Sequence, residues 1–227
     1  RPYAVVMRCS AYSLSQRPVA ERVHRIGKGI RMLLNKPGTT PPARRRPLLV
    51  YGLLLLGGSL LSGCQATFFR ALNTTAGQSA VVVERNTIYD PAHRLALDVY
   101  RPRDARHAPV VVFFYGGSWK SGKRQWYRWA GEALARRGLL VVIPDYRLWP
   151  KVRLDGFMQD AAHAVAWTHA HATEYGGDPS SLFLMGHSAG AHIGALLATD
   201  GHWLAGVGMH PRQLAGFIGL AGPSDFL

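Results

Sequence analysis

Residues 182–190 read LFLMGHSAG, and this stretch carries the strongest signal for the fold. Its first four residues are apolar and predict a buried strand, and the small residues at 189–199 predict a helix that follows directly. Ser188 would then lie on a sharp turn from strand to helix, with its hydroxyl exposed above a sheet. Glycines stand two residues before and after it, where a Cβ would collide with neighbouring elements. The pattern therefore predicts Ser188 as a nucleophile rather than part of an ordinary surface turn.

Strands and helices alternate on both sides of this turn. The first two apolar runs, joined by the turn-prone Asp90-Pro91, are typical of an antiparallel pair. The alternation that follows indicates a doubly wound, mostly parallel α/β sheet. The expected strands are residues 80–84, 95–100, 109–115, 139–144, 182–185 and 217–221, and the expected helices are residues 124–137, 155–175 and 189–199.

A second motif, Tyr115-Gly116-Gly117-Ser118-Trp119, comes at the end of the apolar run at residues 109–115, and we call it the glycine loop. Glycines in such a loop let backbone N–H groups approach a developing alkoxide, and each donor is worth about 3–4 kcal/mol of barrier. We expect Gly117 and Ser118 to donate together with Ala189, the first residue after the serine. The plainer alternative is a Gly-Gly turn that only links strand to helix.

Three motifs together resemble one family. Gly-Gly-Ser-Trp at residues 116–119, Asp-Tyr-Arg-Leu at 145–148 and Gly-His-Ser-Ala-Gly-Ala-His at 186–192 look like the hormone-sensitive-lipase-like esterases of the α/β-hydrolase superfamily. The arylformamidase, feruloyl-esterase-like and isoprenylcysteine-methylesterase-like members are most similar. The resemblance covers about residues 80–227. One departure is Tyr115, because many relatives have a histidine there that braces the loop.

The resemblance implies a serine hydrolase that cleaves a small carboxylic ester, or an aryl amide or formamide, through an acyl-enzyme on Ser188, with no cofactor. The family's catalytic acid follows a seventh strand and its histidine follows an eighth, whereas this sequence passes only a sixth. We therefore expect the last strands to be missing and both residues to lie beyond residue 227. Asp225 is an alternative acid, and its plainer interpretation is a loop carboxylate.

Other residues near these motifs allow more than one interpretation. His163, His169 and His171 share no helical face well, so no metal site is predicted. The aromatic residues that follow the glycine loop could form a substrate wall or simply pack a helix, and these are Trp119, Trp126, Tyr127 and Trp129. An inactive, lipid-anchored binding protein on a hydrolase fold is the alternative function, although the intact motifs argue against it.

The net charge of +14 raises the question of nucleic-acid binding, but the charge is unevenly placed. Residues 1–63 hold 11 of the 27 Lys and Arg residues and one acid, Glu21, whereas residues 64–227 hold 16 basic and 12 acidic residues. The globular part is only mildly basic, so nucleic acid is not expected as a partner.

The N-terminal region has the layout of an export signal. Three arginines at residues 44–46 precede an apolar run of about 15 residues, short of the ~20 that span a bilayer. The run ends in Leu61-Ser62-Gly63-Cys64, which resembles the bacterial lipobox, whose cysteine receives a diacylglycerol. By resemblance to known sorting rules, Gln65 favours the outer membrane, on its periplasmic side.

This layout gives four expected segments. Residues 1–43 are an upstream or mis-started segment, since Met32 is a plausible true start, and residues 44–63 are a lipoprotein signal peptide. Residues 64–78 are a linker, and residues 79–227 are a partial α/β-hydrolase domain.

Overall fold

A computed structural model of the protein describes residues 67–74 and 81–223. The predicted signal segment, Cys64 and Asp225 lie outside the described residues. In the described part of the chain, the strands form one six-stranded sheet in the order β1-β2-β4-β3-β5-β6. Their bounds are β1 (Val81–Asp90), β2 (Leu95–Pro102), β3 (Ala108–Phe114), β4 (Leu140–Pro144), β5 (Gly177–His187) and β6 (Gly216–Leu220).

The directions of the strands follow the predicted pattern. β1 and β2 form an antiparallel pair, with Asp90 opposite Leu95 at their turn. β2 also runs antiparallel to β4, whereas β3, β4, β5 and β6 are mutually parallel. The expected entry pair and the mostly parallel α/β sheet are confirmed.

The central strands form the middle of the core because almost every residue in them is apolar. β4 is buried along its whole length, and β3 is buried at every position but Pro109. Such uninterrupted apolar strands are typical of a sheet covered on both faces. β6 pairs with β5 alone within the described residues.

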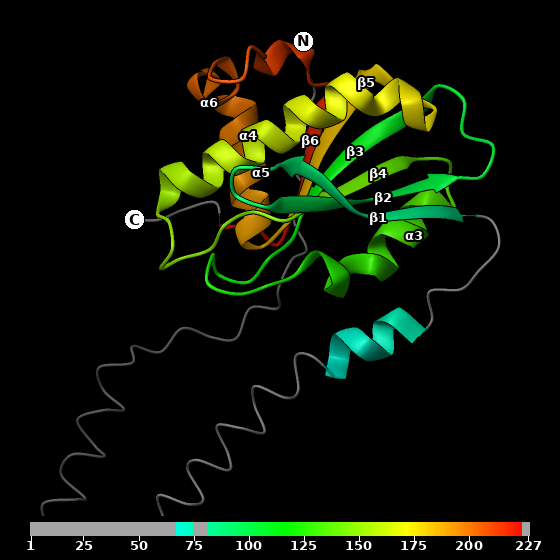
Figure 1. The fold of residues 1–227 in the computed structure, drawn as a ribbon, viewed down its shortest axis with the longest axis horizontal. Helices are drawn as coiled ribbons and strands as arrows, with labels where there is room; N and C mark the ends of the chain where they lie inside the picture. Colours follow the sequence, from blue (N-terminus) through cyan, green and yellow to red (C-terminus); the bar gives the residue numbers. More distant parts are fainter. Residues whose placement is uncertain (1–66, 75–80, 224–227) are drawn as a thin grey trace, which may run out of the picture. The chain divides into compact units, whose positions relative to one another are not determined.

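Helices cover both faces of the sheet (Figure 1). α3 (Arg128–Ala135) packs on β2 and β4 from one face, and α4 (Leu154–His171) and α5 (Ala189–Thr199) pack on the other. The two longer predicted helices each contain a 3₁₀ turn: η1 (Arg124–Tyr127) precedes α3, and η2 (Ala172–Tyr175) follows α4. The short elements after α5 are α6 (Gly201–Ala205) and η3 (Pro211–Gln213).

Part of the expected linker is folded. Residues 67–74 form a helix, and its Phe69 ring stacks on Trp126 of η1 with centroids 5.3 Å apart. The Asn73 side chain donates to the Gln125 carbonyl at 2.9 Å and accepts from the Trp129 amide at 3.0 Å. The stretch predicted as a linker, residues 64–78, thus contains a helix whose Phe69 and Asn73 have specific partners far along the chain.

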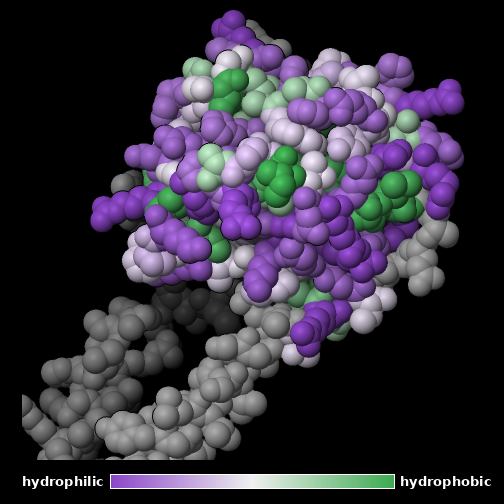
Figure 2. All heavy atoms as spheres, viewed as in Figure 1, coloured by the Kyte–Doolittle hydropathy of each residue, from purple (hydrophilic) through white to green (hydrophobic). Residues whose placement is uncertain are grey.

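One face of the described residues is mostly polar. Figure 2 shows hydrophilic side chains over most of one face, with hydrophobic ones in small separate groups. No helix in residues 67–74 and 81–223 has the length and apolar character needed to cross a membrane.

A buried arginine ties η1 to the sheet. Arg124 is 5% exposed, and its Nε donates to the Asp98 carboxylate of β2 at 2.9 Å. Its other nitrogens donate to Asp145, directly after β4, and to Asn86 in β1. The guanidinium thus joins β1, β2 and the residue after β4 to the segment that follows the glycine loop.

We predict that Arg124→Met destabilises the protein, because it leaves the Asp98 carboxylate buried without its counter-charge. Breaking a buried pair in this way costs about 3–5 kcal/mol, which corresponds to a fall in melting temperature of roughly 10 °C. Thermal denaturation followed by circular dichroism measures it. Arg137→Met, at an exposed arginine after α3, is the matched control, and equal melting temperatures for the two variants would contradict the prediction.

Candidate functional site

Ser188 lies between β5 and α5 in a conformation that side chains rarely adopt. Its φ is 53° and its ψ is −119°, a strained combination of the kind that clusters at functional sites. The Ser188 amide donates to the Leu220 carbonyl at 2.8 Å, which fixes the turn to the end of β6. The predicted turn from strand to helix is present, and we call it the serine turn.

The neighbouring elements approach this turn so closely that only glycine fits beside it. A Cβ on Gly190 would lie 2.1 Å from the Phe114 carbonyl oxygen at the end of β3. A Cβ on Gly186 would lie 2.2 Å from the Gly190 carbonyl oxygen. Both distances are far below van der Waals contact, so the two glycines are required by the packing of β3, β5 and α5.

The loop after β3 is pressed against the same turn. A Cβ on Gly116 would lie 3.0 Å from the Ser188 Cβ and 2.8 Å from the His187 carbonyl oxygen. The next three residues all have positive φ: 141° at Gly117, 54° at Ser118 and 58° at Trp119. The glycine loop predicted from the sequence therefore adjoins the candidate nucleophile.

The three amides predicted as oxyanion donors have no acceptor within the described chain. The N–H groups of Gly117 and Ser118 make no hydrogen bond to the described residues. Ala189 is the first residue of α5, where a helical N–H has no partner inside the helix. Such free donors suit an alkoxide that develops on a reacting carbonyl.

Tyr127 links the glycine loop to the serine turn. Its hydroxyl accepts from the Gly116 amide at 3.3 Å and lies 2.9 Å from Nδ1 of His187. Because that oxygen already accepts one bond, its own proton fits a bond to an unprotonated Nδ1. Burial lowers the pKa of His187, which keeps its ring neutral. The hydroxyl is thus a brace between the two halves of the site.

Two further tyrosines, Tyr115 and Tyr146, pack together at the start of the glycine loop. The Tyr115 ring stacks on Tyr146 with centroids 4.6 Å apart, and the Tyr146 hydroxyl donates to the Tyr115 carbonyl at 2.7 Å. Burial raises the pKa of Tyr115 to about 12, so its hydroxyl stays protonated. Tyr115 and Tyr146 therefore hold the backbone directly before the two glycines.

The segment after β4 is held by an ion pair with α4. Arg147 donates to the Asp160 carboxylate from Nε and Nη2 at 2.7–3.1 Å, and its amide donates to Asp160 at 2.8 Å. The pair raises the pKa of Arg147. It fixes the start of the segment that continues to Trp149.

A cleft of about 360 Å³ opens beside the glycine loop. Its lining residues are Ser118, Trp119, Lys120, Trp149, Arg153, Leu154 and Phe157. Of the four aromatic residues weighed as a substrate wall, only Trp119 lines the cleft. Trp126 and Tyr127 pack against Phe69 instead. Trp149 was not predicted as a cleft residue, because its position there depends on the path of the chain after β4.

No described side chain is hydrogen-bonded to the Ser188 hydroxyl. His187 is directed to Tyr127, and the ring of His192, one turn along α5, meets Trp119 edge-on with centroids 5.4 Å apart. Burial lowers the pKa of His192 as well. Neither histidine is positioned as a base for Ser188.

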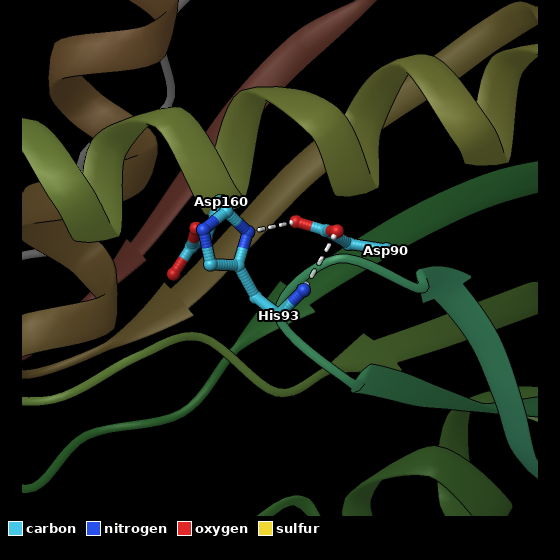
Figure 3. A group of neighbouring side chains, drawn as sticks. All are labelled: Asp90, His93 and Asp160. Carbon is cyan, nitrogen blue, oxygen red and sulfur yellow. Dashed lines mark hydrogen bonds and ion pairs between the residues drawn. The ribbon is translucent and has the colours of Figure 1, made fainter.

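A separate group of side chains could hold a metal by spacing alone. Candidate ligand atoms of Asp90, His93 and Asp160 lie within 4.8 Å of one another (Figure 3). His93 donates twice to the Asp90 carboxylate, from its amide at 3.1 Å and from its ring at 2.7 Å. Arg147 donates to the Asp160 carboxylate. Because a guanidinium already neutralises Asp160, these residues fit an ion-pair network better than a cation site. The sequence did not predict this cluster, because Asp160 lies far along the chain from Asp90 and His93.

The chain is similar to known esterases. The sequence pattern of the BD-FAE family matches residues 97–226. A probable isoprenylcysteine alpha-carbonyl methylesterase of Oryza sativa is 37% identical over 149 residues, covering 65% of this chain and 33% of that protein. Esterase LipC of Mycobacterium tuberculosis is 37% identical over 120 residues, covering 51% and 29%. The structure of esterase B from Lactobacillus rhamnosis, inhibited by a tributyrin phosphonate, matches with a TM-score of 0.55 and 28% identity over 65% of this chain and 49% of that one.

The chain spans about a third of the length of these two curated relatives and about half of the solved structure. The family match covers more than half of the chain and includes the glycine loop, the cleft and the serine turn. The chain therefore belongs to the BD-FAE family and has the α/β-hydrolase fold of the esterases.

Proposed function

We propose that the protein is a serine hydrolase that cleaves a small carboxylic ester through an acyl-enzyme on Ser188. The observation that carries the proposal is the strained turn at Ser188, with the glycine loop pressed against its Cβ. An ordinary surface turn requires neither a serine in this strained conformation nor backbone amides without acceptors beside it. The esterase relatives support the same reaction class.

The mechanism begins with attack of the Ser188 oxygen on the acyl carbonyl carbon. The carbonyl oxygen becomes an alkoxide, which the amides of Gly117, Ser118 and Ala189 stabilise. Collapse of this intermediate expels the alcohol and leaves the acyl group on Ser188. Water then attacks the acyl-enzyme through a second alkoxide held by the same amides, and the acid is released.

The base that takes the Ser188 proton is proposed to be a histidine C-terminal to residue 227. The support is the resemblance to the hormone-sensitive-lipase-like esterases, which implies that this histidine and the acid that orients it follow strands beyond β6. An aryl amide or formamide remains an alternative substrate, because the acyl-enzyme chemistry is the same. An inactive binding protein is the alternative function, and the free amides argue against it.

We predict that Ser188→Ala lowers kcat for a short-chain p-nitrophenyl ester by about 10⁴-fold or more in the full-length protein, because no acyl-enzyme can form. Substrate binding should change little. A fluorophosphonate probe should label the unsubstituted protein and leave the variant unlabelled. Labelling of another serine, or wild-type turnover by the variant, would rule out Ser188 as the nucleophile.

We also predict that Tyr127→Phe lowers kcat by about fivefold, because the lost hydrogen bond from the Gly116 amide, worth about 1 kcal/mol, loosens the glycine loop. KM should stay near its wild-type value, since the ring still fills the same space. Tyr175→Phe, at a partly buried tyrosine in η2, is the matched control. Equal loss of kcat in both variants, or a change in KM alone, would contradict a role for Tyr127 in positioning the loop.

We further propose that Cys64 is lipidated, which would tether the protein to the periplasmic side of a bacterial outer membrane. The support is the basic and apolar layout of residues 44–63 and the four residues that end in Cys64. The helix at residues 67–74 begins only three residues later. A lipid on Cys64 would therefore hold the domain close to the membrane surface.

Cys64→Ser should abolish incorporation of labelled palmitate in a bacterial host and move the protein from the membrane fraction to the periplasmic fraction. Cys9→Ser is the matched control, because the predicted cleavage would remove that residue. Retention of label or of membrane association by Cys64→Ser would sink the lipidation proposal.

A further inference from the structure

The cleft beside the glycine loop combines apolar walls with two cations. Trp119, Trp149, Leu154 and Phe157 form its walls, and it begins at Ser118, a proposed oxyanion donor. The Trp149 amide donates to the Trp119 carbonyl at 2.9 Å, which joins the two sides of the cleft. A group bound here would therefore lie beside the reacting carbonyl.

The outer wall of the cleft leaves large apolar side chains in water. Trp149 is 49% exposed and Leu154 is 42% exposed. Covering either side chain with an apolar ligand would be favourable at about 25 cal/mol for each Å² removed from water. A ring or branched chain that enters the cleft gains this contact.

The charges at the cleft are all of one sign. Its charged lining residues are Lys120 and Arg153, and no acidic residue lines it. Lys120 Nζ lies 4.9 Å from the Trp149 ring centroid, so its ammonium is directly over the apolar wall. Within the described chain neither cation pairs with a carboxylate, in contrast to the nearby Arg124 and Arg147.

We infer that this cleft selects substrates in which an apolar, preferably aromatic, group carries an anionic substituent such as a carboxylate. The inference rests on the proposed function, since it names the substrate class of the same site. The walls would cover the apolar part, and Lys120 and Arg153 would face the anion. Two cations without a carboxylate partner in the described chain favour an anionic ligand over its neutral analogue by their summed Coulomb attraction.

The first experiment compares two esters that differ in charge. In the full-length protein, kcat/KM is measured for p-nitrophenyl hydrogen glutarate, which carries a carboxylate, and for p-nitrophenyl valerate, which has a methyl group in its place. The ratio of the two values should fall about three- to fivefold in Lys120→Met and again in Arg153→Met, as expected for exposed ion pairs. The wild-type ratio should also fall as salt rises to 0.5 M.

Lys151→Met is the matched control. Lys151 is an exposed cation two residues before Arg153, and it does not line the cleft. It changes the net charge by the same amount, so a general electrostatic effect would lower the ratio equally in all three variants. That result would overturn the inference, and an unchanged ratio in Lys151→Met supports it.

The second experiment measures binding without catalysis. In Ser188→Ala, calorimetry should show tighter binding of 2-naphthoate than of 2-naphthamide, and the Lys120→Met/Arg153→Met pair should remove the difference. This readout separates the two proposals, because a protein that hydrolyses neither ester can still bind naphthoate. Equal affinity for both compounds overturns the inference. The inference is also overturned if the Lys120→Met/Arg153→Met pair loses binding to phosphatidylglycerol vesicles but keeps its affinity for naphthoate. The two cations would then recognise a membrane surface.

Discussion

The site depends on one steric constraint, the close approach of three backbone segments around Ser188. The end of β3, the serine turn and the first turn of α5 come so near that a Cβ at Gly190 would meet a carbonyl oxygen at 2.1 Å. The loop after β3 adds a second close approach, between Gly116 and the Ser188 Cβ. This spacing would let the amides proposed as oxyanion donors, in the loop after β3 and at the start of α5, act on one reacting oxygen.

Buried polar groups hold these segments in their strained conformation. Tyr127 connects the glycine loop to His187, and Arg124 anchors the turn that carries Tyr127 to β2 and to the end of β4. Backbone strain at a site persists only where its surroundings over-determine it. The stability of the domain and the geometry of the candidate site therefore share the same few side chains, and a single buried charge supports both.

Much of the fold could be predicted because its signals are local. The run of apolar residues in β3 and the small residues of α5 predict their elements without reference to partners. The helix at residues 67–74 could not be predicted, since so short a stretch has a weak local signal and its Phe69 packs on Trp126, 57 positions further along the chain. Likewise, the aromatic residues after the glycine loop divide into packing and cleft residues only when their neighbours are known.

Residues adjacent in the chain encode the α/β alternation, the turn at Ser188 and the glycine loop, so these features could be predicted from the sequence. Tertiary packing sets which groups hold that loop, which aromatic residues line the cleft and which cations have no carboxylate partner in the described chain. These properties depend on distances between residues from different strands and helices. Such distances are set by how the sheet and its helices pack, and local sequence patterns do not predict them.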